Sequence, residues 1–234
     1  MIRPYDQLPG FMQKPEILSY YLQIKKKRIS LILKRAFDLI VGSFLLILLS
    51  PVMLIVAILI KVDSPGPIFY RQIRVTQYGK QYRIFKFRTM VNSKGKNKQL
   101  ITGKNDNRIT KVGSKIRDLR IDEIPQLLNV LTGDMTFVGT RPEVLQYVEK
   151  YTPEMMATLL LPAGITSPAS IKYKDETEVI QEYEKQGMEV EDIYTNIILP
   201  EKMEYNLTYL KKFSFLGDLK VMIDTVVAVL KRKE

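Results

Sequence analysis

A long apolar stretch near the N-terminus dominates the pattern of hydrophobic and polar positions. Leu39–Ile60 runs for 22 residues without a charged side chain. At about 1.5 Å per residue, a helix of this length matches the roughly 30 Å hydrocarbon core of a bilayer. Ser50-Pro51 falls at its midpoint, where proline removes a helix hydrogen bond and favours a bend. Basic residues flank both ends, and the positive-inside rule places such flanks in the cytoplasm.

Three interpretations fit an apolar stretch of this kind. A helix that enters the membrane, bends at Ser50-Pro51 and returns keeps both basic flanks on one side. An ordinary membrane span with a tolerated proline is the simpler alternative. A cleaved signal peptide is disfavoured, because the stretch starts late and lacks a small-residue cleavage site. Residues 25–37 before it read as a basic amphipathic helix at the headgroup level, or as a plain basic flank.

Two alternating runs after the apolar stretch predict a β-hairpin. Residues 68–75 and 81–90 are separated by the short, glycine-containing segment 76–80. Alternation places Lys86 and Arg88 on the same strand face, and two cations there suit a phosphate group. A solvated face over an aromatic core is the alternative. Residues 91–110 are polar and predict a mobile loop.

The second key stretch begins with two adjacent carboxylates, Asp122-Glu123. The preceding residues 111–121 look helical, and Asp122 fits the N-cap of a following helix that has Pro125 in its first turn. A helix start favours bound phosphate, because its free N–H groups and dipole attract negative charge. The pattern leaves open whether Asp122 is merely a cap or a carboxylate nucleophile.

The remaining segments predict a mixed α+β fold. Residues 133–142 read as a short strand between turns, Leu161–Pro168 as a surface loop, and residues 175–212 as helical. An amphipathic helix at 217–230 either packs as core or lies on the membrane, and the core position is preferred.

Composition narrows the chemistry further. The chain has no cysteine and no histidine, which excludes thiolate nucleophiles and histidine acid–base chemistry and leaves a hard cation on oxygen ligands as the expected metal. The net charge of +11 is uneven: residues 61–120 hold sixteen Lys or Arg against three acidic residues. A basic block beside a membrane segment suits headgroups or phosphorylated substrates. No nucleic-acid module is visible, so nucleic acid is not an expected partner.

Several motifs in a fixed order make the chain similar to a known family. From about Lys34 to the C-terminus it resembles the monotopic phosphoglycosyl transferases, a group of bacterial sugar transferases. The matching stretches include KRAFDLIVGSFLLILLSPVMLIVAILIKVDSPGPIFYRQIRV, YRIFKFRTM, RITKVGSKIRDLRIDEIPQLLNVLTGDMTFVG, RPE, GIT and FLGDLK.

The resemblance implies a monotopic membrane protein whose helix is re-entrant and bent at Ser50-Pro51. It implies the membrane helix at 34–62 and a small α/β catalytic domain with amphipathic interfacial helices at 63–234. The residues ahead of the resemblance, 1–33, are expected to form a leader with a basic interfacial segment. The expected location is the bacterial inner membrane, with the active site on the cytoplasmic face.

The implied reaction moves a sugar-1-phosphate from a UDP-sugar to polyprenyl phosphate and releases UMP, the first step of surface glycan synthesis. By resemblance, Asp122 is the nucleophile that forms an aspartyl-phospho-sugar, and Glu123 is the Mg²⁺ ligand. The resemblance assigns phosphate or donor binding to the basic residues Arg117, Lys86, Arg88 and Arg141.

Some positions depart from the family pattern, namely Thr76, Thr140 and Leu161-Pro162-Ala163. They leave the two carboxylates intact but put the identity of the sugar in doubt. A catalytically silent scaffold in a glycan-assembly complex is the competing function. A homo-oligomer or downstream glycosyl transferases are possible partners.

Overall fold

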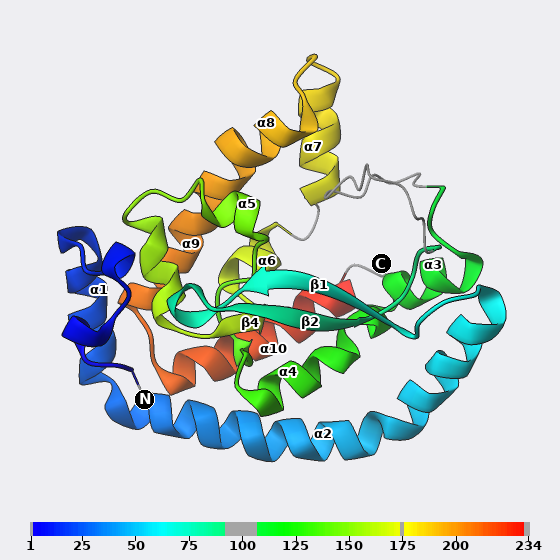
Figure 1. Cartoon of the computed structure of the whole chain (residues 1–234), viewed down its shortest axis with the longest axis horizontal. Coiled ribbons are helices and arrows are strands. Elements are labelled where there is room, and N and C mark those ends of the chain that lie inside the picture. The colour runs from blue at the N-terminus through cyan, green and yellow to red at the C-terminus, as the bar shows by residue number, and fades with distance from the viewer. Residues whose placement is uncertain (1, 92–106, 174–175, 232–234) are drawn as a thin grey trace.

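Helices and two small sheets make up the part of the chain that the computed structural model describes, residues 2–91, 107–173 and 176–231 (Figure 1). The mixed α and β content agrees with the prediction, whereas the predicted loop 91–110 lies mostly outside these residues. The helices are α1 Pro15–Lys26, α2 Arg28–Asp63, α3 Lys111–Asp118, α4 Leu127–Thr132, α5 Leu145–Val148, α6 Pro168–Lys172, α7 Glu176–Glu184, α8 Val190–Ile193, α9 Leu199–Lys211 and α10 Phe215–Lys231, and the strands are β1 Phe69–Val75, β2 Gln81–Phe87, β3 Met135–Val138 and β4 Ala163–Thr166. Short 3-10 or π-helical turns are Tyr5–Gln7, Gly10–Met12, Gln77–Gly79, Ile121–Gln126, Met155–Leu160 and Tyr194–Ile198.

The predicted apolar helix is α2, which is 36 residues long and continues through Pro51. The Ser50 hydroxyl donates to the carbonyl of Ile47 at 2.8 Å. Figure 1 shows α2 following the lower edge of the molecule and turning upward toward its C-terminal end. Only 11% of its most apolar 18-residue window is buried. That exposure is unlike a soluble core helix, so α2 could lie in a membrane.

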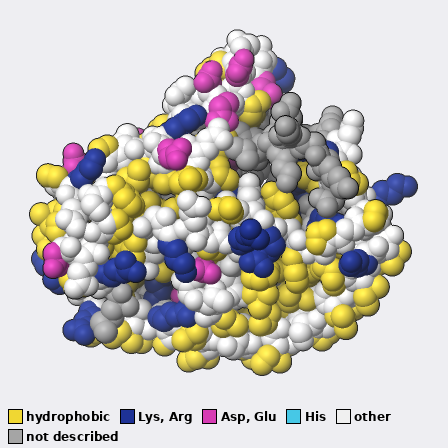
Figure 2. All heavy atoms as spheres, in the orientation of Figure 1, with side chains coloured by type: hydrophobic (Ala, Val, Ile, Leu, Met, Phe, Trp, Pro, Cys, Tyr) yellow, Lys and Arg dark blue, Asp and Glu magenta, His cyan; other side chains and the backbone are white. Residues whose placement is uncertain are grey.

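One face of α2 rests on the rest of the protein. Its buried residues recur every four positions at Lys34, Asp38 and Gly42 and again at Val56 and Ile60, which is the spacing of a single helix face. The opposite face exposes large apolar side chains, and hydrophobic atoms line this lower edge (Figure 2). Exposed members include Ile40, Phe44, Ile47, Leu54, Ile58 and Val62.

The predicted hairpin is confirmed. Strands β1 and β2 pair antiparallel, with Tyr70 opposite Lys86 and Val75 opposite Gln81. The turn between them uses left-handed backbone at Tyr78 and Gly79, as tight connections between strands often require.

A second, parallel pair joins β3 and β4. The strand at β3 agrees with the prediction, but the predicted surface loop 161–168 is wrong, because β4 lies within it and is mostly buried. The two backbones approach so closely that a Cβ built on Gly164 would lie 2.2 Å from the nitrogen of Gly139. Only glycine fits such contact.

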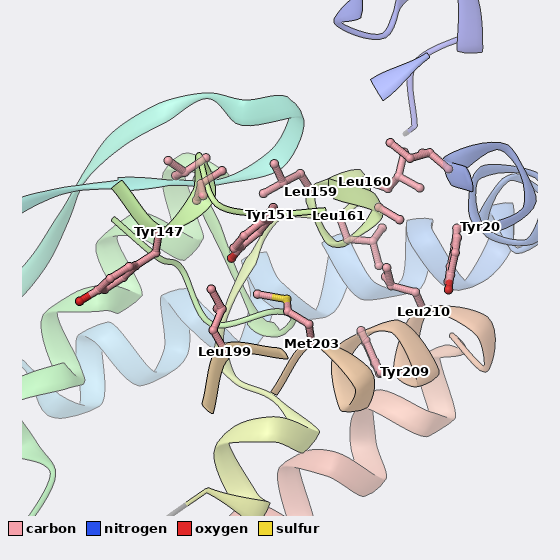
Figure 3. Close-up of a cluster of buried hydrophobic side chains, with 14 of the residues drawn as sticks. Tyr20, Tyr147, Tyr151, Leu159, Leu160, Leu161, Leu199, Met203, Tyr209 and Leu210 are labelled. Carbon is pink, nitrogen blue, oxygen red and sulfur yellow. The ribbon is translucent and has the colours of Figure 1, made fainter. Parts of the chain in front are cut away.

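The N-terminal residues are part of the main core, and the division into a leader at 1–33, a membrane helix at 34–62 and a catalytic domain stays a prediction. Ile17 of α1 is fully buried and Tyr20 and Tyr21 are almost so. They join the same hydrophobic cluster as residues of α9 and of the turn Met155–Leu160 (Figure 3). Apolar residues spaced along one face of α1 account for this packing.

The C-terminal helix α10 exposes much of its apolar face and buries a charged side chain. Leu216, Ile223 and Leu230 are each more than 60% exposed, whereas Asp218 is 2% exposed. The prediction that residues 217–230 pack their apolar face into the core is therefore wrong. Its buried carboxylate is accounted for by an ion pair with Lys34 of α2.

Candidate active site

The adjacent carboxylates lie on the 3-10 helix Ile121–Gln126, which leads directly into α4. The residue before this helix is Arg120, whose φ of 56° is left-handed. The predicted N-cap at Asp122 is thus wrong, because the backbone reversal at Arg120 starts the helix earlier and places Asp122 in its first turn. A non-glycine residue in this conformation costs of order 1 kcal/mol and is typical of functional sites.

Glu123 is held by two cations from distant parts of the chain. Lys86 Nζ lies 2.7 Å, and an Arg141 guanidinium nitrogen 2.9 Å, from the same oxygen, Oε1. Burial by itself disfavours the charged form, but the two cations hold the pKa of Glu123 well below its usual range. Glu123 is therefore an ionised carboxylate in a partly buried, positively charged setting.

Asp122 has a different environment from its neighbour. No hydrogen bond to its carboxylate is found among the residues that the structure describes. Burial and the adjacent Glu123 charge raise its pKa, and Lys86, Arg117 and Arg120 offset only part of that rise. The role of Asp122 as the nucleophile stays a prediction.

Three of the four predicted basic residues surround these carboxylates. Lys86 and Arg141 bind Glu123 directly, and Arg117 at the end of α3 is close enough to stabilise the charge on Asp122. Lys86 comes from β2 and Arg141 follows β3, so packing of separate elements brings them together.

Arg88 does not join this group. It is 6% exposed, and its guanidinium donates to the carbonyls of Ser64 at 2.6 Å and Pro65 at 2.9 Å. A third bond reaches the carbonyl of Ile60, in the last turn of α2. Helix ends leave carbonyls without partners, so these contacts favour a role in holding α2; donor binding by Arg88 stays a prediction.

Asn129 on α4 is a feature that the sequence reasoning missed. It is 2% exposed, and its side-chain amide bonds the backbone of β2 on both sides of Ile84. The available signal was a single amide inside the apolar run 127–131, since buried amides need partners.

The donor set fits a substrate-bound magnesium ion better than a protein-enclosed one. Among the described residues, no group of three or more carboxylates gathers. Mg²⁺ commonly uses one or two carboxylates together with substrate phosphates and water. Both cations on Glu123 contact Oε1. The other oxygen of Glu123 and the Asp122 carboxylate are therefore the oxygen atoms that could bind Mg²⁺.

Comparison with known proteins places the chain among sugar transferases. A UDP-glucose:undecaprenyl-phosphate glucose-1-phosphate transferase of Klebsiella pneumoniae is 36% identical over 85% of this chain and 40% of its own length. A UDP-N-acetylgalactosamine-undecaprenyl-phosphate N-acetylgalactosaminephosphotransferase of Aeromonas hydrophila is 34% identical over 85% of this chain and 44% of its own length. The chain thus spans less than half of these two relatives.

A third relative is matched over most of its length. The sugar transferase EpsL of Bacillus subtilis (strain 168) is 34% identical over 86% of this chain and 88% of its own length. The family model described as bacterial sugar transferase matches residues 29–232. With a match across nearly the whole chain and the two carboxylates at its centre, this protein belongs to the bacterial sugar transferase family.

Proposed function

We propose that this protein transfers a sugar-1-phosphate from a UDP-sugar to polyprenyl phosphate, giving polyprenyl-diphospho-sugar and UMP. The observation that carries the proposal is the contrast between Asp122, which has no fixed partner among the described residues, and Glu123, which two cations hold ionised. The relatives' names, which specify UDP-sugars and undecaprenyl phosphate, support the substrate classes. Such a product is the first lipid-linked intermediate of a surface glycan.

The proposed mechanism has two displacements at phosphorus. An Asp122 carboxylate oxygen attacks the sugar-bearing phosphorus, the bond to the UMP oxygen breaks, and UMP leaves with that electron pair. An oxygen of polyprenyl phosphate then attacks the same phosphorus and releases the Asp122 carboxylate. An ionised carboxylate needs no general base, which suits a chain without histidine.

The basic residues have separate parts in this scheme. Arg117 favours the ionised form of Asp122, and Lys86 and Arg141 orient Glu123 while adding positive charge where phosphate oxygens gather. Mg²⁺, when bound through Glu123 and the donor phosphates, supplies charge neutralisation for the transferring group.

The proposed membrane arrangement is a re-entrant α2, bent at Ser50-Pro51, in the bacterial inner membrane with the site on its cytoplasmic face. Two observations support it: the outer face of α2 is apolar, and its inner face rests on the domain along much of its length. Cysteines introduced near Ile29 and near Asp63 should react with a membrane-impermeant reagent from the same side. Reaction from opposite sides means that α2 crosses the bilayer.

The reaction is tested by UMP release from a panel of UDP-sugars, with detergent-solubilised protein, Mg²⁺ and polyprenyl phosphate. The parent should release UMP in a lipid-dependent way with at least one donor. Asp122→Asn, which is isosteric and should fold, should release none. Full activity in that variant rejects the mechanism. If no donor supports release, either the right sugar was not in the panel or the protein is a silent scaffold. Measured binding of the donors decides between these two explanations.

A further inference from the structure

Asn129 connects the two elements that carry the site. It lies in α4, six residues after Glu123, and it faces β2, which carries Lys86. Its Oδ1 accepts from the backbone N–H of Phe85 at 2.8 Å, and its Nδ2 donates to the backbone carbonyl of Arg83 at 3.1 Å. The side chain is 2% exposed, so water does not compete for these bonds.

Asn129 bonds the free edge of β2 in the way that the backbone of a neighbouring strand would. Residues Arg83 and Phe85 are two apart, so their backbone groups point to the same edge of β2. That edge faces away from β1, and an amide with one donor and one acceptor bonds it as a neighbouring peptide would. A carboxylate could accept from Phe85 but would face the Arg83 carbonyl with a second acceptor. An apolar side chain would leave the Phe85 N–H without its partner and the Arg83 carbonyl with only the Arg71 guanidinium, at 3.2 Å.

The position of this link matters because the next residue along β2 is Lys86. Its ammonium group lies 2.7 Å from Glu123 Oε1, so the spacing between β2 and the carboxylate helix sets that ion pair. We propose that Asn129 is a positioning residue, which fixes β2 against α4 and thereby holds Lys86 on Glu123. The consequence for catalysis rests on the proposed function, whereas the consequence for Lys86 does not.

Lysine labelling tests the positioning without any assay of activity. Purified full-length protein in detergent, without donor or metal, is pulsed with acetic anhydride, and modification of each lysine is read by mass spectrometry. In Asn129→Asp and Asn129→Leu we expect Lys86 to label at least about fivefold faster than in the parent, because a buried backbone bond is lost and β2 opens locally. If one variant fails to fold, the other carries the test.

Two controls separate positioning from general loosening. Lys34 is 6% exposed and pairs with Asp218 of α10, not with the carboxylate helix, so its labelling should stay within about twofold of the parent unless the whole protein opens. Asn206→Asp changes another asparagine that is 2% exposed, on α9, and should leave Lys86 labelling at the parental rate. Unchanged Lys86 labelling in both Asn129 variants, or an equal rise at Lys34, overturns the proposal.

Kinetics then test the catalytic consequence. With a donor that the parent uses, kcat per folded molecule should fall by about tenfold or more in both Asn129 variants, since small misplacements of reacting groups have effects of this size. Asn206→Asp should keep the parental kcat. A parental kcat in folded Asn129 variants overturns the positioning role. Absence of UMP release from the parent, together with absence of donor binding, counts against the proposed function and not against the positioning of Lys86, which the labelling decides.

Discussion

At the scale of single residues, Asp122 and Glu123 are neighbours with opposite electrostatic settings. Because burial and the Glu123 charge raise the pKa of Asp122, keeping its carboxylate ionised costs the folded protein some stability at neutral pH. Asp122→Asn removes that charge, so we expect a stability gain of about 0.5–2 kcal/mol together with the loss of UMP release. Thermal melting of both proteins in EDTA checks this, and a lower melting temperature for the variant contradicts it.

Replacing the Glu123 carboxylate should lower the stability of the protein, whereas replacing that of Asp122 should raise it. The Glu123 charge compensates Lys86 and Arg141, whose side chains are 21% and 35% exposed. Glu123→Gln leaves these cations without an anion, and we expect a loss of about 1–3 kcal/mol. The same melting experiment provides the comparison. Equal shifts for the two neighbouring variants would mean that the two carboxylates share one environment.

At the scale of elements, a buried polar seam fastens α2 to the domain. Lys34 pairs with Asp218 of α10 at 2.6 Å, and Asp38 accepts from Thr136 Oγ1 at 2.7 Å and from the N–H of Phe137 at 3.1 Å. Lys34 therefore serves as a structural cation and not as a basic flank that faces headgroups.

The seam makes a prediction about paired substitutions. Lys34→Met leaves Asp218 buried without its cation, and we expect a loss of about 3–5 kcal/mol. Lys34→Met combined with Asp218→Leu removes both charges and should recover part of that loss. Denaturant unfolding in detergent measures all three proteins. If the double variant is less stable than Lys34→Met alone, the unpaired charge of Asp218 is not what destabilises the single variant.

Arg88 gives a second prediction at this scale, at the junction of α2 and β2. Its bonds to the carbonyls of Ile60, Ser64 and Pro65 predict that Arg88→Met lowers stability by about 1–3 kcal/mol. The KM for the UDP-sugar should stay within about twofold, because the side chain does not reach the carboxylates. A KM raised more than tenfold at unchanged stability would restore the donor-binding prediction.

At the scale of the whole molecule, the exposed apolar faces of α2 and α10 predict which surface meets the bilayer. The chain contains no tryptophan, so a single introduced tryptophan reports its own surroundings. In vesicles, Val226→Trp on α10, where the native residue is 59% exposed, should emit at shorter wavelength and be quenched by lipids with brominated acyl chains.

The matched control is Gln186→Trp in the acidic part of the chain between α7 and α8, where the native residue is also exposed. Its emission should be that of an indole in water and should not respond to brominated lipid. Similar quenching at both positions would mean that α10 does not define the membrane-facing side.

Much of the local structure could be predicted from the sequence. Two alternating runs around Thr76–Lys80 predicted the hairpin, and the apolar length of Leu39–Ile60 predicted α2, because periodicity and hydrophobicity are properties of neighbouring residues. The sequence also singled out Asp122 and Glu123, whose catalytic roles stay predictions. The error at Asp122 came from Arg120, since a left-handed arginine has no sequence signal.

The sequence by itself determined the chemistry that is available to this protein: adjacent carboxylates, an excess of cations and an apolar helix, without cysteine or histidine. Only the tertiary structure decided which cation meets which carboxylate. Lys86 and Arg141 are far from Glu123 along the chain, Arg88 turns to the end of α2, and Lys34 is buried on Asp218. A charge that is removed from water needs a partner nearby in space, so burial favours such pairings. Which residues become neighbours depends on how the elements pack, and the distance between two residues along the sequence does not predict it.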